Sequence, residues 1–308
     1  MGIKVQDLAY VRFRAPDLDA METFLGDFGM LTADKGSDVL YMRGTYSDAF
    51  LHVTHRGDPS FAGVAFEAAS LDDLEALAKS DHVSISRLDG PGGGSVIQLR
   101  DPDGFAVEVV AGRTPSARIE IAPVAPVNDS YAMRRHNVVK RIAKGPSHVV
   151  RLGHCVLNVS NFRASEEWYK SRFGLITSDE IAFGAPGEAL GAFMRCDRGP
   201  LPSDHHTLFL LASSAPKFNH AAFEVADFDD LMRGNDWLAQ KGRHHEWGVG
   251  RHILGSQIFD YWRDPWGHTL EHWTDGDLLG AEWGSRVSSI ADLIGVQWGP
   301  SAPPTMGS

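Results

Sequence analysis

The two halves of this chain repeat one order of sequence features, and this internal repeat restricts the possible folds more than any other property. A strand pattern followed by an amphipathic helix spans residues 8–29, and the same pair recurs at residues 152–174. Residues 63–67 (Gly-Val-Ala-Phe-Glu) likewise match residues 220–224 (His-Ala-Ala-Phe-Glu), and an aspartate-rich helix start follows each. A chain with such a repeat is expected to build two similar units.

A third match places a tight turn before a strand in both halves. Residues 101–104 (Asp-Pro-Asp-Gly) correspond to residues 264–267 (Asp-Pro-Trp-Gly), and Asp-Pro-x-Gly is a turn signal. An apolar strand that carries a glutamate follows each turn. Together with the earlier matches, this predicts two β-α-β-β-β modules in each half and four in the chain.

Composition excludes several classes of partner. The formal net charge of −11 argues against nucleic acid or an anionic membrane, because both bind basic patches. No apolar stretch approaches the roughly 20 residues of a membrane-spanning helix. Cys155 and Cys196 are the only 2 cysteines, and their spacing fits neither a disulfide framework nor a zinc site, so buried reduced thiols are expected. A cytoplasmic protein is the expectation.

Three polar residues interrupt apolar, strand-like segments of the second half: His154, His220 and Glu271. Two imidazoles and one carboxylate are the ligand set that holds Fe(II) and leaves coordination positions open for substrate and O2. Because the three residues lie on corresponding strands of repeated modules, they are expected to meet. The sequence therefore predicts a metal site, and a metal-dependent dioxygenase is the favoured function.

The first half has a different set of residues at the corresponding positions. Tyr10 stands for His154, Gly63 for His220 and only Glu108 repeats the carboxylate of Glu271. One carboxylate does not make a metal site, so the first half is predicted to hold no metal and Glu108 to be a relic of the repeat.

These differences and a change of composition divide the chain into four predicted parts. Residues 113–147 are rich in Pro, Ala and basic residues and are interpreted as a connector. Trp283 and Trp298 indicate that the C-terminal residues pack against the rest, and the sequence from Gly299 onward is predicted to be loose. The predicted parts are an N-terminal domain without metal (1–112), the connector (113–147), a catalytic metal-binding domain (148–276) and a C-terminal extension (277–308).

A longer motif connects the second half with a known family. Gly250-Arg251-His252 precedes a segment that begins at Tyr261, continues with the Asp-Pro-Trp-Gly turn and ends at Glu271. With this motif, and over nearly its whole length, the chain resembles type I extradiol ring-cleaving dioxygenases of the vicinal oxygen chelate superfamily, the group of catechol 2,3-dioxygenase and 2,3-dihydroxybiphenyl dioxygenase. One position departs, since an apolar residue usually precedes the tyrosine and here it is Asp260. On a strand Asp260 points away from the face of Tyr261, so the site is expected to be intact.

The resemblance implies an α+β fold in which each domain is a curved mixed sheet around a central cavity, with helices outside. It implies that Fe(II), or alternatively Mn(II), binds to His154, His220 and Glu271. It also implies that the protein cleaves a small aromatic diol with O2 beside the two hydroxylated carbons, giving a ring-opened semialdehyde or keto acid, and that it forms a homo-oligomer. Residues 253–255 (Ile-Leu-Gly) replace polar residues of relatives that act on biphenyl diols, so the substrate stays open.

Three further residues match catalytic positions of this family: His206, His252 and Tyr261. The spacing to His220 fits His205 as well as His206, but the residues that follow His206 match the family better. His206 would stabilise charge that develops on O2 and donate a proton, and His252 with Tyr261 would hold or deprotonate the diol.

Two other functions remain possible on the same scaffold. One is a glyoxalase-like metal-dependent isomerase or lyase, which would not need His252 and Tyr261 together. The other is a non-catalytic small-molecule binding protein, in which the metal residues should be lost from both halves. Elsewhere, His244 and His245 are predicted to lie in an exposed loop, and Glu67 and Glu224 are predicted to be structural because both halves contain them.

Overall fold

The computed structural model describes residues 2–122, 125–184 and 187–304. The strands of its first half are β1 (Val5–Ala15), β2 (Leu31–Lys35), β3 (Val39–Arg43), β4 (His52–Arg56), β5 (Ser60–Ala68), β6 (Ser86–Arg87), β7 (Ser95–Arg100) and β8 (Ala106–Ala111). The helices of this half are α1 (Leu18–Asp27) and α2 (Leu71–Ser80).

The second half has corresponding elements and several additional short ones. Its strands are β9 (Val149–Val159), β10 (Ile176–Ala182), β11 (Ala189–Arg195), β12 (Ser203–Asp204), β13 (Leu208–Ala212), β14 (Lys217–Val225), β15 (His244–His252), β16 (Ile258–Arg263), β17 (Thr269–Thr274), β18 (Leu278–Leu279), β19 (Arg286–Ser288) and β20 (Val296–Trp298). Its helices are α3 (Phe162–Phe173), α4 (Phe228–Gln240), α5 (Ile290–Ile294) and the short 3-10 turn η1 (Ala281–Trp283).

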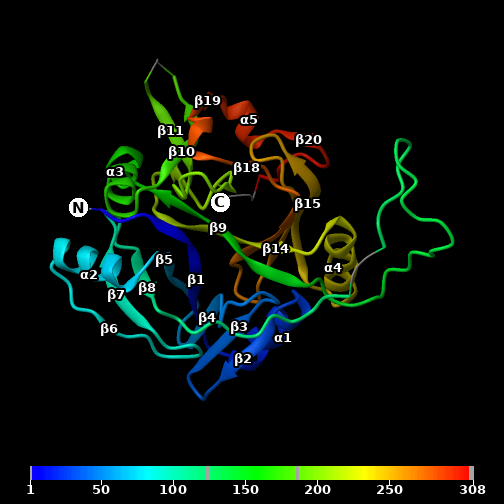
Figure 1. The fold of residues 1–308 in the computed structure, drawn as a ribbon, viewed down its shortest axis with the longest axis horizontal. Helices are drawn as coiled ribbons and strands as arrows, with labels where there is room; N and C mark the ends of the chain where they lie inside the picture. Colours follow the sequence, from blue (N-terminus) through cyan, green and yellow to red (C-terminus); the bar gives the residue numbers. More distant parts are fainter. Residues whose placement is uncertain (1, 123–124, 185–186, 305–308) are drawn as a thin grey trace.

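The two halves contain sheets with the same topology (Figure 1). The first has the strand order β2-β3-β4-β1-β5-β8-β7-β6. The second has the order β19-β10-β11-β13-β9-β14-β17-β16-β15-β20, so its inner strands repeat the first sheet with β9 in the place of β1. In both, the two central strands are antiparallel, and each has a parallel neighbour on its other side. The predicted α+β fold of four β-α-β-β-β modules is confirmed.

Local sequence determines where the helices begin and end. The side chain of Asn161 accepts a hydrogen bond from the backbone N–H of Ala164 at 3.1 Å, which caps α3. The same helix ends at Gly174, whose φ of 65° is left-handed and therefore favours glycine. Asparagine and glycine are residue types that commonly occupy these two cap positions.

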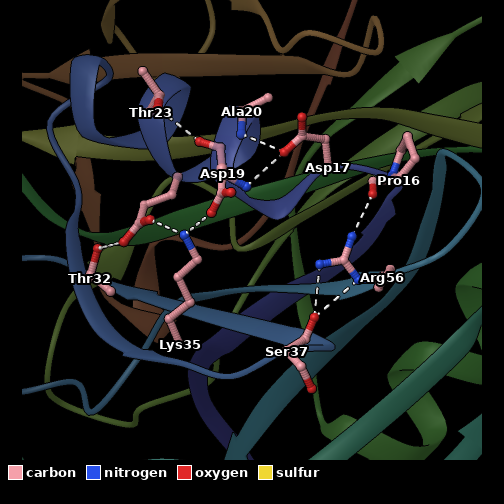
Figure 2. A network of polar contacts seen from close by, with 10 residues as sticks. Pro16, Asp17, Asp19, Ala20, Thr23, Thr32, Lys35, Ser37 and Arg56 are labelled. Carbon is pink, nitrogen blue, oxygen red and sulfur yellow. Dashed lines mark hydrogen bonds and ion pairs between the residues drawn. The ribbon is translucent and has the colours of Figure 1, made fainter.

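A polar network on the surface fixes helix α1 relative to the strands that follow it (Figure 2). Asp17 Oδ1 accepts hydrogen bonds from the backbone N–H groups of Asp19 and Ala20 at 2.9 and 3.0 Å. Lys35 on β2 contacts the carboxylate of Asp19, and Arg56 on β4 donates to the carbonyl oxygen of Pro16 at 2.8 Å. Exposed pairs of this kind add little free energy each, and none of these residues lines the cavity described below.

Aromatic side chains join the two halves. Phe13 on β1 packs edge-on against Phe218 on β14, with ring centroids 5.3 Å apart, and also contacts the ring of His268 at 5.0 Å. Phe28 stacks on His272 at 3.7 Å, and His272 Nε2 donates to the carbonyl oxygen of Phe28 at 2.6 Å. One hydrophobic core therefore contains residues of both halves.

The C-terminal residues are more ordered than the sequence predicts. Strand β19 pairs with β10 and strand β20 with β15, so both outer edges of the second sheet are formed by the extension. Trp298 packs against Phe228, in agreement with the prediction that this part of the extension packs against the rest of the protein. Residues 299–304 contain no helix or strand, but the prediction of loose sequence is wrong at Pro300, whose carbonyl oxygen accepts a hydrogen bond from Trp247 Nε1 at 2.8 Å. Residues 305–308 lie outside the described part.

The connector contains no helix or strand within its described residues, and Figure 1 shows much of it as a loop that runs away from the sheets. Among the described residues, no helix is long and apolar enough to cross a membrane. Cys155 and Cys196 are buried and unpaired, as expected. The boundaries at 112, 147 and 276 stay a prediction.

The contacts of Phe13 generate a prediction about stability. Replacing Phe13 by Ala is expected to lower the free energy of unfolding by about 3–5 kcal/mol, because it leaves a cavity between the two halves. Urea denaturation followed by tryptophan fluorescence would measure the loss. The matched control is Phe183→Ala, whose side chain is 52% exposed and which should change the free energy by no more than about 0.5 kcal/mol. Equal losses for the two variants would contradict the role of Phe13.

Candidate metal centre

Three adjacent strands of the second sheet carry the predicted metal ligands. His154 on β9 is paired with Ala222 on β14, and Ala222 is paired in turn with Glu271 on β17. His220 lies two residues before Ala222 and therefore on the same face of the sheet, since side chains alternate along a strand. The register thus directs all three side chains to one face.

The three side chains converge at a buried point. His154 Nε2 lies 3.1 Å and His220 Nε2 3.4 Å from Glu271 Oε2. One ligand atom from each residue lies within 4.8 Å of the others, which makes them a group that could hold a metal ion. In the described part of the chain no second group of histidine, cysteine and carboxylate side chains has such geometry.

The electrostatics of the group suit a cation. Burial by itself raises the pKa of Glu271, but His154 and His220 outweigh it and hold the pKa well below its ordinary value, so this fully buried carboxylate is ionised. Glu271 Oε1 is also buried and has no hydrogen-bond partner among the described residues. His220 Nδ1 lies 2.8 Å from Asn219 Oδ1, which orients the ring so that Nε2 faces the carboxylate. The donor set fits a divalent ion of the Fe(II) or Mn(II) kind.

His252 and Tyr261 lie next to this group. Tyr261 on β16 is paired with Glu271 on β17, so its side chain emerges on the same face. Tyr261 Oη lies 2.9 Å from His252 Nε2. Burial lowers the pKa of His252 to about 4, and burial together with the charge of Glu271 raises the pKa of Tyr261 well above its ordinary value. Near neutral pH the pair is therefore an uncharged imidazole and an uncharged phenol.

The structure separates the roles of the two neighbouring histidines. The ring of His206 lies 4.0 Å from that of His154, centroid to centroid, and lines the cavity. His205 lies behind it: its Nδ1 is 3.1 Å from His206 Nδ1 and its Nε2 is 2.7 Å from Asp179 Oδ2. Burial, followed by the nearby imidazoles, lowers the pKa of His206 well below its ordinary value, so the ring is neutral. The position next to the predicted ligands favours His206.

Asp179 was not identified from the sequence. It lies on β10, far along the chain from His205, and no motif surrounds it. Asp179 accepts a hydrogen bond from His205 Nε2. His205 Nδ1 is therefore free to accept a hydrogen bond from His206 Nδ1. This assignment leaves His206 Nε2 as the atom that can accept a proton or a hydrogen bond.

A cavity that is open to solvent lies above the predicted metal ligands. Most of its lining side chains are apolar, and its polar ones are mainly those just described. The lining residues are His154, Val156, Phe193, His206, Phe209, Leu211, Asn219, His220, Trp247, His252, Leu254, Gln257, Tyr261, Leu293, Ile294 and Ala302.

The equivalent position of the first half is filled by an ion pair. Arg12 on β1 is paired with Gly63 just as Val156 on β9 is paired with His220. The guanidinium of Arg12 contacts the carboxylate of Glu108, and Tyr10 Oη donates to Glu108 Oε2 at 2.7 Å. An arginine thus provides the positive charge at this carboxylate.

Other polar residues have structural contacts. Glu67 binds Arg113 and Glu224 binds Arg151, as a structural role requires. His244 and His245 are exposed as predicted, but the prediction of a loop is wrong, since both begin strand β15. His245 Nε2 lies 2.8 Å from the buried carboxylate of Asp260. Asp260 also accepts from Trp262 Nε1, and its side chain points away from the cavity as expected.

Comparison with known proteins relates these features to a family. Residues 151–272, which include His154, His220 and Glu271, match the model of the Glyoxalase/Bleomycin resistance protein/Dioxygenase superfamily. The matched residues contain all three predicted metal ligands, so this part of the chain is similar to that superfamily.

Two relatives of similar length match nearly the whole chain. Metapyrocatechase 2 of Cupriavidus necator is 29% identical over 309 residues, covering 97% of this chain and 90% of that protein. An iron-dependent extradiol dioxygenase of Rhodococcus jostii (strain RHA1) is 24% identical over 315 residues, covering 95% and 97%. The resemblance to extradiol dioxygenases inferred from the sequence is confirmed.

Solved structures show the same two-sheet fold. Homoprotocatechuate 2,3-dioxygenase from Brevibacterium fuscum, in complex with 3,4-dihydroxyphenylacetate, superimposes with a TM-score of 0.80 at 18% identity over 99% of this chain and 92% of that one. A Mn(II)-bound glyoxalase from Novosphingobium aromaticivorans gives a TM-score of 0.79 at 22% identity over 99% and 98%. At these identities the likeness shows a shared fold, and the chemistry has to be argued from the site.

The geometry generates a prediction about metal binding. The protein loaded anaerobically with Fe(II) should retain a single ion per chain, and His220→Ala or Glu271→Gln should weaken that binding by at least about 100-fold, because each removes a ligand of the buried group. Metal content after gel filtration would measure this. Glu108→Gln is the matched control, since it changes the equivalent carboxylate of the first half and should keep the ion. Loss of the ion in that control alone would contradict the assignment.

Proposed function

We propose that the protein is an extradiol dioxygenase that opens the ring of a catechol-type diol with O2. The supporting observation is that His154 and His220, which converge on the buried Glu271, line one cavity with His206, His252 and Tyr261. The curated relatives, named as a metapyrocatechase and an iron-dependent extradiol dioxygenase, favour this reaction over others on the same fold.

In this proposal His154, His220 and Glu271 hold Fe(II), with Mn(II) as the alternative. When bound, such an ion supplies Lewis acidity toward a diol and open coordination positions. Asn219 keeps the ring of His220 oriented for this task through its contact with Nδ1. All three residues are buried, and Glu271 has no exposed surface.

The pair of His252 and Tyr261 would bind and orient the diol. Tyr261 Oη has one proton, which it can donate either to His252 Nε2 or to a catechol oxygen. When Tyr261 donates to a catechol oxygen, His252 Nε2 is free to accept a proton from the diol. Burial lowers the pKa of His252. A negative charge that develops on the substrate would raise this pKa again and favour protonated His252.

His206 would serve the reacting oxygen atoms on another side of the cavity. Its Nδ1 is engaged by His205, which leaves Nε2 to accept a proton from the diol and to donate it to an oxygen atom as negative charge develops there. Asp179 and His205 then act as positioning residues, because they fix which ring nitrogen of His206 carries the proton. The product would contain both atoms of O2 and be a ring-opened semialdehyde or keto acid.

A second function has one specific observation in its favour. The Mn(II)-bound glyoxalase shares the fold over nearly the whole chain, so a glyoxalase-like isomerase or lyase on this site is the alternative. That reaction requires metal but no O2, whereas a non-catalytic binding protein would require neither turnover nor O2.

The proposal also includes the predicted two-domain division and a homo-oligomer. Several apolar side chains of the connector are strongly exposed in the single chain, among them Tyr131 at 99% and Met133 at 76%. Exposed apolar side chains that lie close together are typical of a surface that packs against another subunit. Sedimentation analysis should therefore give a mass above that of the 33.7 kDa chain.

The decisive test is aerobic turnover by the reconstituted protein. After anaerobic loading with Fe(II), admission of O2 to a panel of catechols should give a yellow ring-fission product. His206→Ala and Tyr261→Phe should lower kcat by about 10²–10⁴, the usual loss when a general acid or base is removed. Tyr46→Phe, an exposed tyrosine away from the cavity, is the control and should leave kcat unchanged.

Two results would reject this function. Tight Fe(II) binding without opening of any diol would favour the isomerase or lyase. Failure to bind any metal would reject the ligand assignment itself.

A further inference from the structure

We infer that the site selects uncharged catechols that carry an apolar substituent, such as an alkyl chain or a second ring, and that the C-terminal segment 290–302 forms part of the wall that selects them. This inference rests on the proposed ring cleavage and specifies its substrate class.

One wall of the cavity is a flat aromatic surface. Phe193 on β11 and Phe209 on β13 stack with ring centroids 4.0 Å apart and an angle of 7° between the planes. Val156 belongs to the same buried cluster, and Leu254 and Leu293 pack against it. A substituent directed toward this wall would meet only hydrocarbon.

The opposite wall is also aromatic and is tied to the C-terminal segment. Trp247 on β15 stacks on Tyr261, with centroids 5.4 Å apart and an angle of 13°. Its Nε1 donates to the carbonyl oxygen of Pro300 at 2.8 Å, and Ala302 packs against the same cluster. The indole N–H of Trp247 therefore already has a hydrogen-bond acceptor, and the ring presents its apolar face to the cavity.

Strand pairing and a side-chain hydrogen bond hold the C-terminal segment in place. Strand β20 pairs with β15, and Gln297 Nε2 donates to the carbonyl oxygen of His252 at 2.9 Å. On the other side of α5, strand β19 pairs with β10. Leu293 and Ile294 of α5 are thereby fixed between two attached strands, where both line the cavity. The extension completes the outer wall and contributes apolar side chains.

The lining contains no charged partner for an anionic substituent. Among the described residues that line the cavity there is no lysine, arginine, aspartate or glutamate. The nearby Arg251 is occupied elsewhere, because it donates to Asp275 Oδ2 at 2.7 Å and to the carbonyl oxygen of Ser256. A carboxylate carried by the substrate would therefore lose water without gaining a counter-charge, which is strongly unfavourable.

The extent of the apolar lining agrees with a substituted ring. Beyond the two stacked phenylalanines, the lining includes Leu254, Leu293 and Ile294. An unsubstituted catechol would leave apolar wall in contact with water. Each buried methylene on the substituent should raise kcat/KM by about three- to fourfold until the wall is covered.

The test compares substrates that differ in charge but little in shape. The panel is catechol, 4-propylcatechol, 3,4-dihydroxyphenylacetate and the methyl ester of that acid. With the Fe(II)-loaded protein, 4-propylcatechol and the ester should have kcat/KM at least about tenfold above catechol and at least about 100-fold above the acid. Anaerobic calorimetry should give dissociation constants in the same order without turnover.

A variant of the C-terminal segment tests where the selection occurs. Leu293→Arg places a cation in the outer wall, so it should raise kcat/KM for the acid by about tenfold or more relative to the ester. Leu278→Arg is the matched control, since Leu278 lies in the same extension, is 63% exposed and does not line the cavity. Its ratio of acid to ester should equal that of the unsubstituted protein.

The outcomes separate this inference from the proposed function. Opening of the acid and the ester with equal kcat/KM, or an unchanged ratio in Leu293→Arg, would overturn the inference while ring cleavage stands. If no member of the panel is opened, the proposed ring cleavage is wrong. The order of the calorimetric dissociation constants then decides whether the cavity selects apolar substituents. Preference for 4-propylcatechol over the acid would support the apolar selection, and equal binding would overturn it.

Discussion

The burial of one carboxylate between two imidazoles is the constraint on which the second half of this protein depends. Glu271 has no exposed surface, so it is stable as an anion only where positive charge or hydrogen-bond donors surround it. His220 reaches it from the adjacent strand β14, and His154 reaches it from β9, on the far side of β14. A slip of one residue in either pairing would turn a side chain to the opposite face of the sheet, so the register and the site are determined together.

In the first half, the buried carboxylate is neutralised in a different way. Glu108 occupies the equivalent strand position, but Gly63 offers no side chain, and Arg12 extends into the space and neutralises the carboxylate. A guanidinium forms a fixed ion pair and has no lone pair with which to bind a metal. This half therefore keeps the sheet and loses the coordination chemistry, and through Phe13 it supports the strand that carries His220.

Sequence alone was sufficient for the repeat, the four modules and the convergence of the predicted ligands, because strand alternation and turn motifs are local and occur twice. It was insufficient where a contact joins distant residues without a motif. Asp179 binds His205 from another strand, and only that contact shows how His205 stands behind His206. The two strands of the extension were missed for a related reason: β19 and β20 are three residues long, too short to show alternation, and they form by pairing with existing edges.

Chemistry and selectivity are consequently carried by different parts of the second sheet. The predicted ligands lie on its inner strands, where pairing on both sides restricts every substitution. The wall that would meet a substituent includes Trp247 on β15, next to the edge strand β20, and Leu293 in helix α5, which lies outside the sheet. Substitutions there change the shape or charge of the cavity and leave the register of β9, β14 and β17 intact. A protein built in this way can alter the substituent it accepts by changing a wall residue, while the group that would hold the metal stays as it is.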